Sequence, residues 1–171
     1  MDYKDNIVLI GMPGSGKTTV GRSLAALTAM TFLDLDDEIQ RAAGKDIPRI
    51  FYEEGEEGFR LRETDCARKA AALRGFVIAC GGGIILKEEN MEALSRTGTV
   101  VFLDRSAEEL AAAELSGRPL HDGRKERLQE LYDARIALYR KYAELTVPSS
   151  RAPEMVAQMV WEAISTRKEG D

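Results

Sequence analysis

The chain has 171 residues, a length that favours one domain with a sizeable core. Its 24 Lys and Arg and 29 Asp and Glu residues give a formal net charge of −5, which disfavours sequence-independent nucleic-acid binding because that requires a basic face. There is no apolar run of the roughly 20 residues that a membrane span needs, no secretory signal pattern, and no cysteine framework. We therefore expect a cytoplasmic protein with no membrane or nucleic-acid partner.

Short apolar runs alternate along the chain with longer helical patterns. The apolar runs predict strands at residues 7–10, 31–33, 76–79, 99–103 and 145–147. The helical patterns lie at residues 17–29, 36–44, 47–74, 106–116, 124–142 and 153–166, with expected breaks at Gly44, Pro48, Gly55 and Gly58. Strands that alternate with helices predict an α/β fold, with a parallel sheet covered on both faces.

A phosphate-binding motif follows the first predicted strand. Residues 11–18, GMPGSGKT, match G-x-x-x-x-G-K-[ST] at every fixed position, and a predicted helix begins where the motif ends. Glycines let backbone N–H groups turn inward around phosphate oxygens, and the helix directs its positive end at the same anion. The positive charge of the Lys17 ammonium would lie against the β- and γ-phosphates, and the Thr18 hydroxyl can bind Mg²⁺. The motif predicts nucleoside-triphosphate binding but does not specify a reaction.

Other features narrow the class of phosphate-loop protein. The chain has no Asn-Lys-x-Asp guanine motif, which disfavours a GTPase, and a large motor ATPase would need a longer chain. Asp104 ends a predicted strand, as metal-binding aspartates of some ATPases do, but we interpret it as a residue of the following turn. The remaining class is a compact kinase for a nucleotide or small metabolite, with a second-substrate site and a lid.

Two carboxylates mark the candidate second-substrate site. Asp34 and Asp36 end the second predicted strand, and the alternation of side chains along a strand would place both on one face. The carboxyl edge of a parallel sheet is where α/β proteins bind ligands. One carboxylate could lie near the metal and the reacting hydroxyl, and the other could accept hydrogen bonds from a polyol. Alternatively, Asp36 caps the next helix.

Arg60 and a glycine run extend this candidate site. Arg60 lies four residues after Glu56 and three before Glu63, which fits either a surface ion-pair ladder or a guanidinium that binds a substrate carboxylate. Gly81, Gly82 and Gly83 directly follow the third predicted strand, where backbone without side chains lets a ligand approach closely.

Two further arginines lie later in the chain. Arg118 is in the loop between two predicted helices and could close over the transferring phosphate, or it could be a solvated loop residue. Arg135 lies within a predicted helix, where a surface position is the simplest interpretation.

Taken in order, these motifs resemble shikimate kinase across essentially the whole chain. They are the phosphate loop, Phe32-x-Asp34-x-Asp36, Ile50-Phe51 followed by Gly55-Glu56-x-x-Phe59-Arg60-x-x-Glu63, Gly81-Gly82-Gly83, Arg118-Pro119-Leu120 and Arg135-x-x-Leu138-Tyr139. The resemblance implies a five-stranded parallel sheet in a P-loop NTPase architecture. It also implies a single kinase domain over residues 1–171, with the phosphate loop at 11–18, a substrate-binding segment at about 34–63 and a short lid at about 112–124.

The activity implied by this resemblance is phosphoryl transfer from ATP to the 3-hydroxyl of shikimate, a step of aromatic amino-acid biosynthesis. ATP and shikimate would be the ligands of a monomeric protein, and Mg²⁺ would be the cofactor. Two alternatives stay open: a kinase for another polyol acid such as gluconate, and a catalytically silent nucleotide-binding module.

The resemblance also assigns roles to individual residues. The implied ATP-binding residues are Gly14, Ser15, Gly16, Lys17, Thr18, Thr19, Arg118 and Arg151. The implied shikimate-binding residues are Asp36, Arg60, Gly81, Gly82 and Arg135. Thr18 and Asp34 would hold Mg²⁺, and the implied catalytic residues are Lys17, Asp34 and Arg118. Residues 111–114, AAAE, lack the arginine that often flanks adenine in the family, which predicts weaker or less selective adenine binding.

Overall fold

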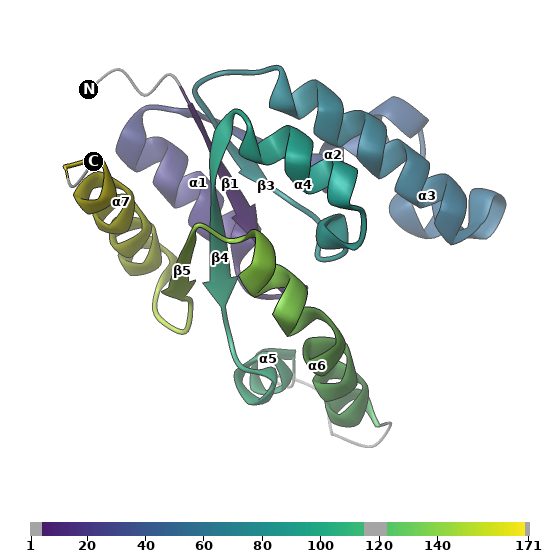
Figure 1. The fold of residues 1–171 in the computed structure, drawn as a ribbon. Helices are drawn as coiled ribbons and strands as arrows, with labels where there is room; N and C mark the ends of the chain where they lie inside the picture. The colour runs from purple at the N-terminus through teal and green to yellow at the C-terminus, as the bar shows by residue number, and fades with distance from the viewer. Residues whose placement is uncertain (1–4, 115–122, 170–171) are drawn as a thin grey trace.

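The structure is a computed structural model and describes residues 5–114 and 123–169. Its five strands are β1 (Asn6–Ile10), β2 (Thr31–Asp34), β3 (Phe76–Ala79), β4 (Gly98–Asp104) and β5 (Leu145–Pro148). They form one sheet in the order β2-β3-β1-β4-β5, and every neighbouring pair is parallel (Figure 1). The predicted α/β fold with a five-stranded parallel sheet is confirmed.

Helices cover both faces of the sheet, as predicted. They are α1 (Lys17–Thr28), α2 (Leu35–Ala43), α3 (Ile47–Ala71), α4 (Glu88–Ser95), α5 (Ala107–Glu114), α6 (Arg124–Tyr142) and α7 (Pro153–Glu169), with a 3₁₀ turn η1 at Ile84–Leu86. Helices α1 and α7 lie on one side of the sheet, and α3, α4 and α6 lie on the other (Figure 1). Among the residues described, no helix is long and apolar enough to cross a membrane.

The central strand β1 explains why the sheet needs two helical layers. Ile7 and Leu9 belong to the core against α1 and α7, whereas Val8 and Ile10 belong to the core against α3, α4 and α6. All four side chains are at most 1% exposed, so the strand is apolar at consecutive positions rather than at alternate ones. Since all strands run the same way, their carboxyl ends meet at one edge, where β1 continues into the phosphate loop.

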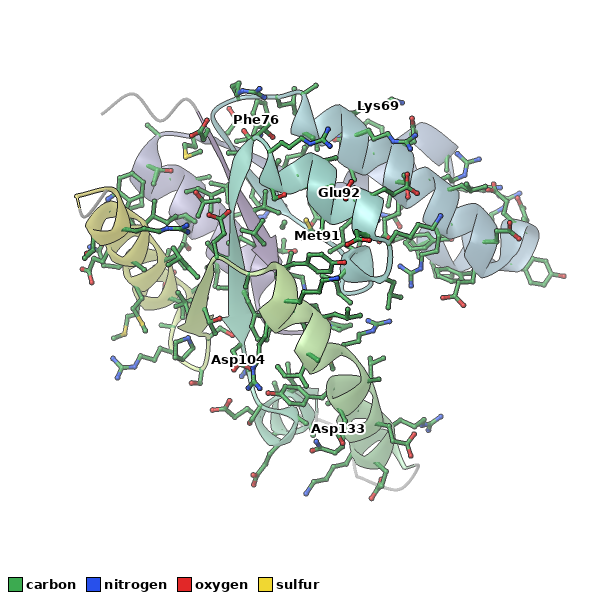
Figure 2. The ribbon with its side chains drawn as sticks, in the orientation of Figure 1. Lys69, Phe76, Met91, Glu92, Asp104 and Asp133 are labelled. Atoms are coloured by element: carbon green, nitrogen blue, oxygen red, sulfur yellow. The ribbon has the colours of Figure 1, made fainter. Side chains whose placement is uncertain are left out.

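Helix α4 was not predicted from the sequence. It has only eight residues, and among its apolar side chains only Met91, which is labelled in Figure 2, and Leu94 are fully buried. Two buried apolar positions are too few to produce a recognisable helical period.

Two boundaries near the site differ from the predictions. Strand β2 ends at Asp34, so Asp36 lies in the first turn of α2 and not in a strand. The Asp34 carboxylate accepts hydrogen bonds from the backbone N–H groups of Asp36 and Asp37, at 2.9 and 3.3 Å. The helix cap is therefore Asp34 and not Asp36, and the prediction that strand alternation aligns the two carboxylates is wrong.

The expected glycine breaks in the next helix also differ. Gly55 has φ 71° and ψ −177° and interrupts α3, as predicted. Gly58 lies within the helical part of α3, so the prediction of a second break there is wrong. Gly58 is instead a place of close packing against Glu54, because a Cβ at Gly58 would lie 2.5 Å from the Cβ of Glu54.

Close packing of α1 on β2 gives a test of the fold. A Cβ at Gly21 would lie 2.6 Å from the Phe32 ring, so Gly21→Val should lower the free energy of unfolding by about 1–3 kcal/mol through overpacking. Ala26→Val, on the exposed face of the same helix, is the matched control and should change it by less than about 0.5 kcal/mol. Urea unfolding measures both values, and equal effects of the two variants would contradict the packing described here.

Candidate active site

The phosphate loop joins β1 to α1 and holds Lys17 inside the site. The Lys17 ammonium donates to the backbone carbonyls of Gly11 and Met12, at 2.7 and 2.8 Å. Lys17 is only 8% exposed, and this burial lowers its pKa to about 8, against the opposing effects of Cys80, Asp36 and Asp34. The ammonium is thus poorly solvated, a condition that an anionic ligand would relieve.

A hydrogen bond connects the phosphate loop to the end of β2. The Thr18 hydroxyl donates to Oδ2 of Asp34 at 2.8 Å, while Oδ1 of the same carboxylate caps α2. The two residues come from different elements of the fold and present oxygen donors side by side. Oxygen donors of this kind suit Mg²⁺, which typically takes one or two protein ligands and completes its shell with phosphate and water oxygens.

One cavity of about 430 Å³ contains many of the predicted nucleotide and acceptor residues, but Ser15, Arg60, Arg135 and Arg151 are not part of its lining. Its lining residues are Pro13, Gly14, Gly16, Lys17, Thr18, Thr19, Asp34, Asp36, Cys80, Gly81 and Gly82. Burial raises the pKa of Asp36, and the nearby Asp34 carboxylate raises it further. The structure therefore brings Asp36 to the cavity from the first turn of α2, although the strand geometry expected for it is wrong.

Arg60 lies beside this cavity in a buried ion pair. Its Nη1 donates to Oε1 of Glu63 at 2.9 Å, and its Nη2 lies 3.6 Å from Glu56. Glu63 is 1% exposed, and burial raises its pKa while Arg60 opposes this effect. The predicted contacts with Glu56 and Glu63 both exist, but the Glu63 contact is internal. A surface ladder alone does not describe this arginine.

The glycine run gives three close approaches that side chains would prevent. A Cβ at Gly81 would lie 2.9 Å from Oδ1 of Asp36, and one at Gly82 would lie 2.7 Å from Cδ of Pro13. A Cβ at Gly83 would collide with the Arg60 guanidinium. Three consecutive glycines therefore let the Asp36 carboxylate, the phosphate loop and the Arg60 guanidinium all approach one stretch of backbone.

Tyr139 of α6 holds this glycine run, a contact that sequence reasoning did not identify. Its hydroxyl donates to the Gly82 carbonyl at 2.6 Å. Its ring stacks on Phe102 of β4, with ring centroids 5.1 Å apart. One turn earlier in α6, Arg135 is half-buried, and its charge affects the pKa values of both Tyr139 and Glu63. Arg135 thus lies near the Arg60 side of the site rather than on an isolated helix surface.

Two further contacts support the phosphate loop from the β4 and β5 side, and neither was predicted. The Ser149 hydroxyl, just after β5, donates to the Ser15 carbonyl at 3.0 Å. Nη1 of Arg105, just after β4, lies 3.4 Å from the Gly14 carbonyl. Both residues follow strands at the edge that carries the loop, and this position is the sequence signal that could have identified them.

Three other residues discussed in the sequence analysis, Arg151, Arg118 and Asp104, are not part of the described cavity lining. Arg151 is exposed between β5 and α7. It is not among the cavity-lining residues in the part of the chain that the structure describes. Arg118 and most of the predicted lid lie outside the described residues. Asp104, at the end of β4 (Figure 2), accepts a hydrogen bond from Tyr132 at 3.3 Å. It is absent from the described cavity lining, which fits the turn interpretation.

Comparison with known proteins agrees with this site. A model of the shikimate kinase family matches residues 13–165. The chain belongs to the shikimate kinase family. The chain is 41% identical to a shikimate kinase of Neisseria meningitidis serogroup C, over 93% of this chain and 96% of that protein. The structure of a shikimate kinase from Acinetobacter baumannii in complex with shikimate superposes with a TM-score of 0.90 and 38% identity, over 98% of this chain and 96% of the other.

A more distant structural relative bears on the gluconate alternative. A gluconokinase from Sinorhizobium meliloti superposes with a TM-score of 0.63 over 99% of this chain and 97% of the other, at 16% identity. At that identity the likeness shows a shared fold and does not extend to the substrate. Membership of the shikimate kinase family makes the chain an ATP-dependent kinase.

The low pKa of Lys17 predicts proton uptake when nucleotide binds. A bound phosphate favours the charged ammonium and raises its pKa above 8, so affinity for Mg-ADP should fall by up to about tenfold per pH unit above that pH. Calorimetry in two buffers with different ionisation enthalpies should show proton uptake that is small at pH 7 and clearly larger at pH 9. Binding heats that do not depend on the buffer at pH 9 would contradict this.

Proposed function

We propose that the protein transfers the γ-phosphoryl group of ATP to the 3-hydroxyl of shikimate, giving shikimate 3-phosphate and ADP. The observation that carries the proposal is the single cavity that joins the phosphate loop to Asp36 and the glycine run, with the Arg60 guanidinium against Gly83. A carboxylate beside exposed backbone suits a polyol, and a guanidinium suits a carboxylate. Shikimate, which the Acinetobacter protein binds, carries both groups.

On the nucleotide side, the loop amides and Lys17 would hold the ATP phosphates. We assign Gly14, Ser15, Gly16, Thr18 and Thr19 to the same task, together with Arg118 and Arg151 as in the sequence prediction. Gly14 and Gly16 have φ values of 80° and 92°, a backbone conformation that turns N–H groups toward an anion and that glycine adopts readily. The contacts of Ser149 and Arg105 with loop carbonyls leave the inner face of the loop for the ligand.

Thr18 and Asp34 are the residues that would hold Mg²⁺. Their oxygens lie 2.8 Å apart at the cavity wall, and they are hard donors of the type that this ion prefers. Within the described part of the chain, no group of three or more His, Cys, Asp or Glu side chains is arranged so that it could hold a metal ion. When bound with ATP, Mg²⁺ supplies charge neutralisation for the phosphates.

Asp34 is also our candidate general base. One of its oxygens is fixed by the α2 cap, and the other faces Thr18 at the cavity wall, so the carboxylate is already oriented. From this position Asp34 would accept the proton of the shikimate hydroxyl while the hydroxyl oxygen of shikimate attacks the γ-phosphorus of ATP. Lys17 would stabilise the negative charge that spreads over the transferring oxygens.

The acceptor would be bound at the opposite end of the cavity. Asp36 would accept hydrogen bonds from the shikimate hydroxyls, and the backbone at Gly81 and Gly82 would lie against the ring. Arg60 and Arg135 would pair with the carboxylate, with Glu63 fixing the Arg60 guanidinium. We propose a monomeric enzyme, as in the sequence prediction.

A panel of acceptors tests the proposal. ADP release with Mg-ATP should be fast with shikimate and low with gluconate, with nucleoside monophosphates and without acceptor. Turnover with gluconate in place of shikimate would overturn the acceptor assignment. Nucleotide binding without turnover on any acceptor would support a silent module instead.

Replacing Asp34 by Asn tests the general base. Asn also caps helices well, so α2 should keep its cap, while the side chain can no longer take up a proton. We expect the kcat for shikimate to fall by about 10²- to 10⁴-fold, with shikimate affinity retained within a few-fold. The control is Asp37→Asn, an exposed neighbour on the same turn, which should leave kcat unchanged. Full activity of Asp34→Asn would refute the role of Asp34.

A further inference from the structure

Helix α3 bends at Gly55, five residues before Arg60. Gly55 has φ 71° and ψ −177°, so the helical hydrogen bonding is interrupted there and α3 consists of two pieces on either side. The second piece carries Arg60 and Glu63 at the site. The direction of this piece therefore depends on what fixes the two pieces relative to each other.

An ion pair joins the two pieces across this bend. Arg62 donates from Nε and Nη2 to the two carboxylate oxygens of Glu54, at 2.8 and 3.0 Å, which makes the pair bidentate. Lys45, from the segment before α3, lies 2.7 Å from Glu54. The Arg62 and Glu54 side chains are 35% and 26% exposed. Arg62 and Lys45 lower the pKa of Glu54 to about 2, so the carboxylate remains charged at every pH where the enzyme would work.

The packing at the bend is built around this ion pair. A Cβ at Gly58 would lie 2.5 Å from the Cβ of Glu54, so only glycine lets the first piece lie this close to the second. Glycine within a helix costs about 1 kcal/mol relative to alanine, and the close approach of Glu54 is what this position requires. Across the bend, Phe51 also stacks on Phe59, with ring centroids 4.6 Å apart.

Arg60 and Arg62 lie on different sides of the same helical turn. Two residues correspond to a rotation of about 200° around a helix. Because the Arg60 side chain faces the site, the Arg62 side chain faces away from it. Arg60 contacts Glu63 and the glycine run, whereas Arg62 contacts Glu54 on the other side. A constraint on Arg62 therefore fixes the rotation and tilt of the turn that carries Arg60.

We propose that Glu54 and Arg62 are positioning residues for the acceptor. Their bidentate ion pair, next to Gly58, holds α3 in its bent geometry. This geometry orients the Arg60 guanidinium so that it can bind the carboxylate of the acceptor. This inference rests on the proposed function. It adds that acceptor affinity is set partly by a contact outside the cavity.

The test compares Glu54→Gln and Arg62→Gln with the wild-type enzyme. Glu54→Gln keeps the size of the side chain and Arg62→Gln shortens it, and each variant removes the ion pair. We expect the KM for shikimate to rise about 5- to 20-fold, because misplacing Arg60 weakens acceptor binding, while kcat and the KM for ATP stay within about twofold. Arg62→Lys keeps the charge but cannot bind both oxygens and should give an intermediate KM. The exchanged pair Glu54→Arg with Arg62→Glu should recover part of the loss.

The matched control is Arg68→Gln on the same helix. It removes an ion pair of similar length, 2.6 Å to Glu89, that lies on the surface and does not cross the bend. This variant should leave every kinetic parameter unchanged. A melting temperature recorded for each variant separates positioning from loss of folded protein.

The outcomes distinguish this inference from the proposed function. A selective rise in the KM for shikimate, with the melting temperature retained, supports positioning. Unchanged KM values in both single variants, or a parallel loss of kcat and melting temperature, would overturn it while an active wild type still upholds the proposed function. A wild-type protein without shikimate turnover in the same assay would overturn both.

Discussion

One carboxylate, that of Asp34, connects the parts of this protein that must act together. One of its oxygens accepts from the Thr18 hydroxyl at the start of α1, and the other accepts from backbone N–H groups at the start of α2. The start of α1, which follows the phosphate loop, and the start of α2 are thereby both bonded to one side chain at the end of β2. This arrangement requires a parallel sheet, because only there do strand ends and helix starts meet at one edge.

The core and the site depend on each other through β1. Its residues are buried on both faces, so the strand cannot shift without opening both helical layers, and the phosphate loop leaves from its end. The loop is then supported from outside, by Ser149 and Arg105, while Lys17 occupies its interior. The cationic side chains of Lys17, Arg60 and Arg135 lie at or near this edge, so a chain of net charge −5 still presents positive charge there.

Much of this was predictable from the sequence, for identifiable physical reasons. Strands β1, β3 and β4 could be predicted because strands buried on both faces are continuously apolar, and the phosphate loop because backbone and lysine chemistry fix its residues. Asp36 was placed in a strand because alternation was assumed to continue, whereas the Asp34 cap ends the strand two residues earlier. The sequence pattern predicts a break at Gly58 because a glycine required by close packing looks the same in sequence as one required by backbone conformation. The contacts of Ser149 with Ser15 and of Tyr139 with Gly82 join residues distant in the chain, so no local pattern specifies these partners, although the position of Ser149 just after a strand marks it as a residue of the loop edge.

The bond from Ser149 to the Ser15 carbonyl has a consequence for biosynthesis. Its two residues are 134 positions apart, and Ser15 is 1% exposed. A ribosome that has made β1 and α1 has therefore produced the phosphate loop without the hydroxyl that satisfies its buried carbonyl. The nascent chain acquires a fully supported nucleotide site only after β5 has emerged and paired with β4. The support that Ser149 gives to the phosphate loop is thus added only after most of the chain has been synthesised, although the loop itself is among the first parts to be made.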